Sequence, residues 1–226
     1  AEYIKGGLTL PDAQKVAVML EEAGVNALHV SAAYIASHEE GYFGCTFSSA
    51  SAPMAIPHGC FVHLAEGIKK VVKVPVIASG RLDEPELAET VIVQGKADLL
   101  AIGRGLLADP AFVSKVYCQQ YDDIRRCIAC CDCQFILFTE SNLRCAINAE
   151  VGKEEEYRIK PAIKAKGVLV VGGGPGGMEA ARVAALRGHK VTLLERKPYL
   201  GGNMVAAAAV SFKREVSRFT EYLSRQ

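Results

Sequence analysis

The stretch Val168-Leu-Val-Val-Gly-Gly-Gly-Pro-Gly-Gly177 decides the fold of the C-terminal part of the chain. Gly172, Gly174 and Gly177 satisfy the pattern G-x-G-x-x-G. In that pattern the first glycine permits a tight turn, the second lets the backbone approach a pyrophosphate, and the third lets the following helix pack close to the strand. Apolar residues ahead of the turn predict a strand, and the alanine-rich segment behind it predicts a helix whose first N–H groups face the phosphates. The stretch therefore predicts the start of a Rossmann-like domain that binds the ADP half of a dinucleotide.

An acidic residue lies where such a domain contacts a ribose. Residues 190–194 predict the next strand, and Glu195 ends it at roughly the twenty-residue spacing expected of the ribose-binding carboxylate. A carboxylate there accepts hydrogen bonds from ribose hydroxyls and disfavours a 2′-phosphate, so we expect FAD or NAD at this turn and not NADP. The alternative is an ordinary glycine-rich strand–helix turn without a ligand.

Three helix–strand units precede this domain. Helical spacing of apolar residues predicts helices, and short apolar runs predict strands. The expected helices are 11–23, 61–72 and 84–94, and the expected strands are 27–30, 74–78 and 98–102. Helices that alternate with continuous apolar strands are typical of parallel α/β architecture. A further helix is expected over 110–120, and 124–150 is expected to be irregular.

Two consecutive strands of this first part end in Gly-Arg, within Ser79-Gly80-Arg81 and Gly103-Arg104-Gly105. In a β/α barrel the loops after strands seven and eight are a common phosphate site. Glycine frees backbone N–H groups there, and arginine offers a forked cation to phosphate oxygens. The two loops together predict a phosphate site, whereas the alternative is two turns with solvated arginines. The candidate residues are Gly80, Arg81, Gly103 and Arg104.

A long segment, residues 31–59, follows the first strand. It is too long for a simple connection, so we expect a functional loop at the same end of the barrel. It contains His38 and His58. His38 is the candidate catalytic residue, as a hydrogen-bonding or proton-transfer group beside a substrate. The alternative for His38 is an exposed loop histidine without a role.

Eight cysteines occur in the chain, and several crowd together. Cys127, Cys130 and Cys133 form C-x-x-C-x-x-C, and Cys145 follows downstream. Three closely spaced thiolates with a distant fourth are typical of iron–sulfur ligation, although zinc also accepts four thiolates. We favour a cluster over zinc and over a site without metal. Cys131, inside the motif, is either an alternative ligand or a spare thiol.

The composition excludes some classes of function. The chain has 226 residues, 50% of them hydrophobic, and a formal net charge of +1 without a basic run, so nothing favours nucleic acid as a partner. The apolar runs are too short to predict a membrane span, and no secretory leader is evident. Crowded cysteines without a leader favour metal coordination in a reducing compartment, so we expect a cytoplasmic protein and leave a homo-oligomer open.

Taken together, the motifs resemble those of the iron–sulfur flavoenzymes related to old yellow enzyme. That group includes 2,4-dienoyl-CoA reductase, 2-enoate reductase and trimethylamine dehydrogenase, and the resemblance covers almost the whole chain. The stretches that carry it are Pro75-Val-Ile-Ala-Ser-Gly-Arg-Leu82, Ala101-Ile-Gly-Arg104, Leu107-Ala-Asp-Pro110, Cys127-Ile-Ala-Cys130, Cys145-Ala-Ile-Asn148, Val170-Val-Gly-Gly-Gly-Pro-Gly-Gly177 and Gly201-Gly-Asn203.

The resemblance implies that the chain is a fragment of a longer α/β enzyme. It implies the C-terminal part of a (β/α)8 TIM barrel, then a Cys-rich iron–sulfur loop, then the start of a Rossmann-like FAD-binding domain. The implied boundaries are 1–122 for the FMN-binding barrel, 123–150 for the iron–sulfur segment, 151–166 for a linker and 167–226 for the FAD/NAD(P)-binding domain.

The resemblance also implies a cofactor for each motif. The phosphate of FMN would be held by Arg81, Gly103 and Arg104. A [4Fe–4S] cluster would be ligated by Cys127, Cys130, Cys133 and Cys145. FAD would lie against the glycine-rich turn and would contact Gly176, Glu195 and Asn203.

In the reductases of this group, electrons run from NAD(P)H to FAD, through the cluster to FMN, and then as hydride to a polarised C=C bond. The resemblance thus implies an NADH:flavin oxidoreductase whose small-molecule substrate is an unsaturated carboxylate or acyl-CoA ester, with the fragment alone inactive. The spacing between Cys130 and Cys133 is that of the amine dehydrogenase, whereas the gap before Cys145 is that of the reductases. The alternatives are therefore an amine dehydrogenase of the trimethylamine type and a non-catalytic electron-relay module.

Overall fold

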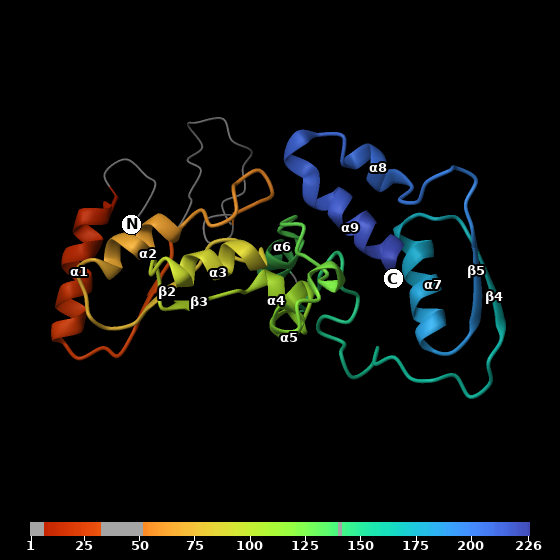
Figure 1. Cartoon of the computed structure of the whole chain (residues 1–226), viewed down its shortest axis with the longest axis horizontal. Coiled ribbons are helices and arrows are strands. Elements are labelled where there is room, and N and C mark those ends of the chain that lie inside the picture. The colour runs from red at the N-terminus through yellow and green to blue at the C-terminus, as the bar shows by residue number, and fades with distance from the viewer. Residues whose placement is uncertain (1–6, 33–51, 140–141) are drawn as a thin grey trace.

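A computed structural model describes residues 7–32, 52–139 and 142–226. Within these ranges the chain forms two α/β parts joined by the segment that carries the clustered cysteines (Figure 1). Strands β1 to β3 belong to the first part, and β4 and β5 belong to the second. None of the helices in the described ranges is long and apolar enough to cross a membrane. The mixed α/β class is the one that the sequence predicts.

In the first part, three parallel strands lie side by side in the order β1 (Leu28–Val30), β2 (Val76–Ala78) and β3 (Leu99–Leu100). The register places Val30 opposite Ala78 and Ala78 opposite Leu100, so the strands end at one edge of the sheet. The preceding helices are α1 (Leu10–Glu22), α2 (Val62–Lys69) and α3 (Pro85–Val93). The buried core between them consists of Ala17, Ala65, Ile68, Val76, Ala78, Leu82, Val91 and Ala97. The predicted helix–strand units are confirmed, with shorter strands than expected.

The start of α1 shows how local sequence sets an element. The Thr9 hydroxyl accepts from the N–H of Asp12 at 3.4 Å, and the Asp12 carboxylate accepts from the N–H of Thr9 at 3.1 Å. This reciprocal capping satisfies N–H groups that have no partner inside a helix. Pro11 lies in the first turn, where its missing N–H costs nothing. The helix therefore begins one residue earlier than its apolar spacing predicts.

The segment after β3 differs from the single helix expected over 110–120. It forms α4 (Arg104–Ala108) and α5 (Phe112–Tyr117), because Pro110 disfavours helical backbone at the preceding residue and Asp109 is extended. The buried carboxylate of Asp109 accepts from the N–H of Arg125 at 2.9 Å. Asp109 thus fixes the break between the helices and ties it to the chain leading into the cysteines.

The cysteine segment is more regular than expected. Within 124–150 the structure contains a helix, α6 (Asp132–Thr139), which begins directly after Cys131. Ala129 and Cys131 have positive φ angles of 48° and 61°, a conformation that costs energy for residues other than glycine. These two left-handed residues lie within the cysteine motif, and the cysteines of the motif line one pocket.

In the second part, β4 (Gly167–Val171), α7 (Pro175–Leu186) and β5 (Lys190–Leu194) form a parallel strand–helix–strand unit. The register runs from Gly167 opposite Lys190 to Val171 opposite Leu194. This is the local topology that the glycine-rich turn predicts.

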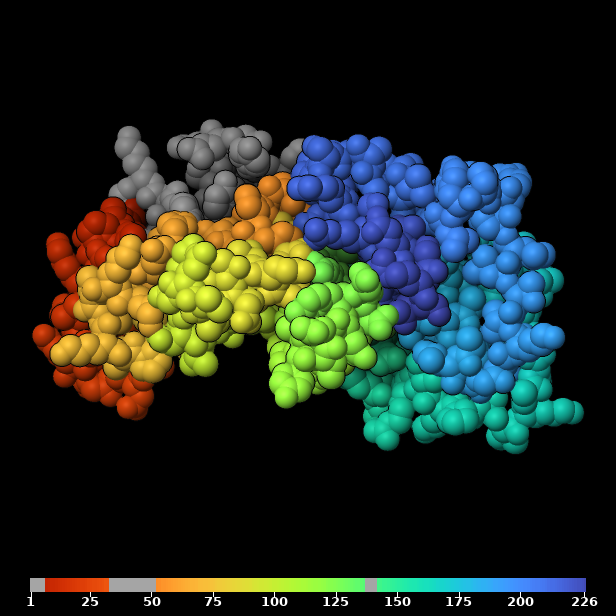
Figure 2. Space-filling view, viewed as in Figure 1, coloured from red at the N-terminus to blue at the C-terminus, as the bar shows by residue number. Residues whose placement is uncertain are grey.

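Two helices follow β5. The first is α8 (Asn203–Ala207), and the second is α9 (Arg214–Arg225). Met178 of α7 packs with Tyr222 and Leu223 of α9 in a buried cluster. The helix α9 also reaches the first part, where Arg218 pairs with Glu84, and Figure 2 shows the dark-blue C-terminal residues against that part. The two parts are therefore held together by more than the connecting segment.

Candidate functional site

A cavity of about 360 Å³ lies at the carboxyl ends of β1, β2 and β3. Both Gly-Arg loops line it, as expected of two consecutive barrel strands. A Cβ atom added to Gly103 would meet no other atom within 4 Å, so this glycine borders open space. The structure thus brings together all four predicted phosphate-site residues, which are Gly80, Arg81, Gly103 and Arg104.

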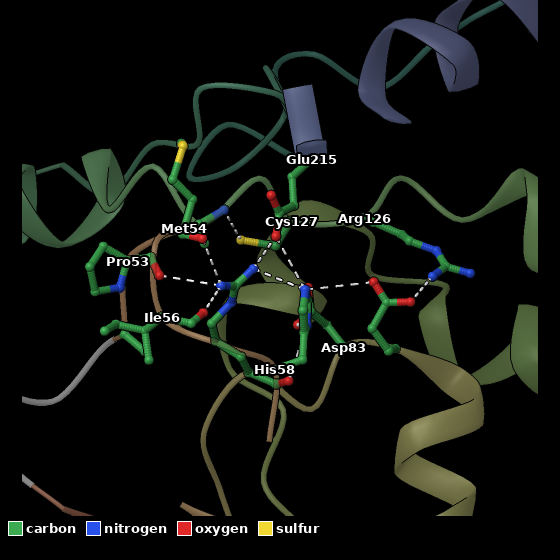
Figure 3. A network of polar contacts seen from close by, with 12 residues as sticks. Pro53, Met54, Ile56, His58, Asp83, Arg126, Cys127 and Glu215 are labelled. Carbon is green, nitrogen blue, oxygen red and sulfur yellow. Dashed lines mark hydrogen bonds and ion pairs between the residues drawn. The ribbon is translucent and has the colours of Figure 1, made fainter. Parts of the chain in front are cut away.

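Arg81 is almost fully buried, with 3% of its side chain exposed. Its Nη2 donates to the carboxylate of Glu215 and lies 2.9 Å from Nε2 of His58. Its Nε is buried and has no hydrogen-bond partner among the described residues. Its Nη1 donates to three backbone carbonyls, which Figure 3 shows on one side of this network: Pro53, Met54 and Ile56. A buried donor without a partner is costly, so Nε is the donor of Arg81 that is left unsatisfied, and Arg81 itself lines the cavity.

Arg104 lies between the cavity and the cysteines. Its Nη2 donates to the carbonyl of Ala52 at 2.7 Å, and its Nη1 donates to Sγ of Cys131 at 3.2 Å. It lines both the cavity at the strand ends and the pocket around the cysteines. One guanidinium therefore faces both predicted cofactor sites.

Five cysteines line that second pocket, and they are Cys127, Cys130, Cys131, Cys133 and Cys145. Across the described ranges, no group of three or more His, Cys, Asp or Glu side chains has the geometry of a metal site. The four predicted ligands thus converge on one pocket without standing at ligating positions.

The chemistry of these thiols fits a cluster. Burial raises the pKa of the Cys127 thiol to about 12, and burial also raises the pKa values of Cys130 and Cys133. A bound metal supplies the positive charge that buried thiolates need. The N–H of Ala129 lies 3.3 Å from Sγ of Cys127, and N–H donors to sulfur are a typical feature around iron–sulfur clusters. The donor set suits thiolate ligation, and the identity of the metal stays a prediction.

The glycine-rich turn of the second part has the geometry that its pattern requires. Gly172 has a φ angle of +105°, which residues with a side chain rarely adopt. A Cβ atom on Gly177 would lie 1.9 Å from the carbonyl oxygen of Gly172, so the close approach of α7 to β4 needs a glycine there. A Cβ on Gly176 would meet no atom within 4 Å, and one on Gly174 would meet only Gly202, at 4.0 Å. The face at the N-terminus of α7 is therefore open to a ligand.

Glu195 orders this turn. Its carboxylate accepts from the N–H of Gly173 at 2.7 Å and from the N–H of Lys197 at 2.9 Å. The hydrogen bond from the N–H of Lys197, followed by that from Gly173, lowers the pKa of Glu195. A carboxylate has lone pairs for further donors, so these contacts leave the predicted ribose contact open. Asn203, another predicted FAD residue, is exposed at the start of α8, next to Gly201, whose N–H donates to the carbonyl of Gly173 at 2.7 Å.

His58 lies among charged groups beside the cavity. Its Nδ1 lies 3.4 Å from Oδ1 of Asp83, and its Nε2 lies 3.3 Å from Oε1 of Glu215 and 3.7 Å from Oε1 of Glu84. Burial lowers the pKa of His58 and so does Arg81, but the hydrogen bond with Asp83 and the carboxylate charges outweigh both, so the pKa lies above its usual value. The carboxylates around His58 therefore favour its charge more than water does.

The functional residues that the sequence predicts and those that the structure reveals are not all the same. His38, the predicted catalytic residue, lies outside the described residues. His58 and Glu215 hold Arg81, yet no motif marks either of them. Glu215 belongs to α9, and only the packing of this helix against the first part identifies its role.

Comparison with known proteins agrees with both parts of the chain. The profile of the NADH:flavin oxidoreductase / NADH oxidase family matches residues 1–123, and the profile named FAD dependent oxidoreductase matches residues 167–223. An NADH oxidase from Thermoanaerobacter brockii is 43% identical over all of this chain and 34% of its own length. A cinnamate reductase from Clostridium sporogenes is 41% identical over 94% of this chain and 31% of its own length.

A solved structure gives the same result. The complex of a 2-naphthoyl-CoA reductase with 2-naphthoyl-CoA superposes with a TM-score of 0.87 and 32% identity, over 98% of this chain and 33% of that one. Amine dehydrogenases also occur among the relatives. The chain spans about a third of the length of these proteins. It belongs to the NADH:flavin oxidoreductase / NADH oxidase family, within the group of iron–sulfur flavoenzymes that includes 2,4-dienoyl-CoA reductase and trimethylamine dehydrogenase.

Proposed function

We propose that the chain is the central portion of an NAD(P)H-dependent oxidoreductase that reduces C=C bonds of unsaturated carboxylates or acyl-CoA esters. Electrons would pass from FAD through a [4Fe–4S] cluster to FMN. The observation that carries the proposal is the placement of Arg104, which lines both the cavity at the strand ends and the cysteine pocket. A one-electron carrier in the cysteine pocket and a two-electron carrier in the cavity would be neighbours, as an electron relay requires.

The residues of the chain have separate tasks in this proposal. Gly103 leaves room for a phosphate, while Arg104 and Nε of Arg81 supply donors to it. The four predicted ligand cysteines supply thiolates to the cluster, and the turn at Gly172–Gly177 exposes the first N–H groups of α7 to the FAD pyrophosphate. When bound, the flavins and the cluster supply the redox chemistry, and the chain positions and orients them.

The substrate class comes from relatives whose names state what they act on. These relatives are a cinnamate reductase and a 2-naphthoyl-CoA reductase, both of which act on an aromatic acid or its CoA ester. The NADH oxidase among the relatives supports a nicotinamide donor. His38 stays the proposed proton-transfer or hydrogen-bonding group at the substrate.

The test uses the complete enzyme that carries this sequence, purified without oxygen. NADH should bleach the flavin absorbance near 450 nm, and cinnamate or an enoyl-CoA should then restore it. Bleaching by trimethylamine but not by NADH would contradict the reductase proposal.

An amine dehydrogenase is the second candidate. The C-x-x-C-x-x-C spacing and the amine dehydrogenases among the relatives favour it. In that case trimethylamine or a methylated amino acid would reduce the flavin, and the electrons would leave to a carrier protein. The same anaerobic titration separates the two activities.

A third possibility concerns this chain alone, as an electron-relay module without catalysis. Purified as it stands, the chain should show broad absorbance near 400 nm with bound iron and sulfide. Zinc without a visible band would contradict a relay of either kind.

A further inference from the structure

The two parts of the chain meet in a network of charged side chains beside the cavity. From the second part, α9 contributes Glu215 and Arg218, and these meet Arg81 and Glu84 of the first part. Figure 3 shows Glu215 approaching the network from one direction, and Asp83 and the backbone carbonyls from others. The Glu215 side chain is 11% exposed and that of Glu84 is 15% exposed. The Arg81–Glu215 pair is therefore screened less by salt than a surface ion pair, whereas Arg218 is half exposed.

The donors of Arg81 divide into two sets. The terminal groups Nη1 and Nη2 face carbonyl oxygens, His58 and the Glu215 carboxylate. Nε alone has no partner among the described residues. A guanidinium is rigid and planar, so fixing its two outer nitrogens also fixes the direction of the Nε–H bond.

Two of the contacts that hold the outer end are with side chains rather than backbone. His58 belongs to the segment before α2, whereas Glu215 comes from α9 in the second part. Among the described residues, Glu215 is thus the one hydrogen-bond partner of Arg81 that belongs to the other part. An arginine held at several points loses little entropy when a ligand arrives, because its rotamer is already set.

We propose that Glu215 is a positioning residue for the phosphate of FMN: by holding the outer end of Arg81, it fixes the guanidinium of a residue that lines the cavity, so a helix of the second part completes a site in the first. The inference rests on the proposed function, since it takes Arg81 as a phosphate ligand. It goes further by making retention of FMN depend on α9, a helix that also packs against the dinucleotide-type unit.

The experiment measures binding of FMN and of riboflavin to the flavin-free complete enzyme by fluorescence quenching. The two ligands differ only in the phosphate. We expect Glu215→Ala to raise the dissociation constant for FMN about tenfold, the equivalent of one charge-assisted hydrogen bond, and to leave that for riboflavin unchanged. Glu221→Ala is the matched control, because Glu221 lies on the same helix and, among the described residues, its hydrogen bond is with Ser217 of that helix.

A double-mutant cycle tests whether Glu215 acts through Arg81. On the background of Arg81→Ala, adding Glu215→Ala should weaken FMN binding no further. If Glu215→Ala does not fold, Glu215→Asp replaces it; the shortened carboxylate should give a smaller loss that is again confined to FMN.

The outcomes separate two failures. If Arg81→Ala weakens FMN and Glu215→Ala leaves it unchanged, tightens it, or weakens FMN and riboflavin alike, then Glu215 is not a positioning residue and the proposed function stands. If Arg81→Ala itself leaves FMN binding unchanged, the assignment of Arg81 as a phosphate ligand is wrong, and the inference falls with that part of the proposed function.

Discussion

The two glycine-containing sites of this chain are built in different ways. At Gly172–Gly177 the backbone makes the site: a positive φ, a close strand–helix approach and the free N–H groups of α7 follow one another within a few residues. At the Gly-Arg loops Gly103 makes room and Gly80 has a φ of 109° against Phe61, but side chains from distant segments set the arginines. A site made of backbone is readable from a local pattern, whereas a site made of converging side chains becomes visible only in the fold.

The largest expected effect breaks the backbone-built site. Gly177→Ala would place a Cβ 1.9 Å from the Gly172 carbonyl oxygen, so α7 must move away from β4. We expect a loss of about 3 kcal/mol of stability in the second part, the upper range for overpacking a close contact. Chemical denaturation followed by circular dichroism measures it.

The matched control is Gly176→Ala, whose Cβ would enter open space. Stability should change by less than about 1 kcal/mol, since alanine is the better helix former and its Cβ meets no other atom. Equal destabilisation by the two substitutions would contradict the steric account of this turn.

The next effect concerns the side-chain-built site. Arg104→Ala removes the cation shared by the cavity and the cysteine pocket, and FMN should bind about 30-fold more weakly, as for the loss of roughly 2 kcal/mol of charge-assisted hydrogen bonding. Arg104→Lys keeps the charge but loses the fork, so it should recover only part of the affinity. Full affinity in Arg104→Ala would show that the phosphate is held elsewhere.

A smaller effect is dependence on pH through His58. Because its pKa is raised in the folded protein, its contacts contribute stability that is complete below the unfolded pKa of about 6.5 and is lost as pH rises through the folded value. The groups that face it are Arg81, Asp83, Glu84 and Glu215. The difference in melting temperature between wild type and His58→Gln should therefore be larger at pH 6 than at pH 8. A difference that grows with pH would contradict the sign.

The smallest effect is expected at Cys131. Its sulfur accepts from Arg104, and a serine hydroxyl can do the same, so Cys131→Ser should leave the iron content per chain unchanged. Cys133→Ser, at a predicted ligand in the same motif, should lose the cluster. Loss of iron in both variants would make Cys131 a ligand and would revise the ligand set.

The same contrast between local backbone and converging side chains explains which features of the fold and the site the sequence predicts. The helix–strand units, the strand–turn–helix at Gly172–Gly177 and the convergence of the Gly-Arg loops are local or follow from parallel topology, and the structure has them. Predicting the break at Asp109 requires the effect of Pro110 on the residue before it. Predicting α6 requires the left-handed conformation of two residues within the cysteine motif. The contact of Glu215 with Arg81 joins residues far apart in the chain, so no local pattern encodes it.

The central claim is that the chain carries two different flavin sites, FMN at the strand ends of the first part and FAD at the turn of the second. The most direct measurement is flavin extraction and chromatographic separation from the complete enzyme and from Arg104→Ala and Gly174→Ala. The account predicts equal amounts of FMN and FAD in the wild type, selective loss of FMN in Arg104→Ala and selective loss of FAD in Gly174→Ala, because a Cβ at the second motif glycine would occupy the face that the pyrophosphate approaches. A single flavin species in the wild type, or the same flavin lost from both variants, would contradict it.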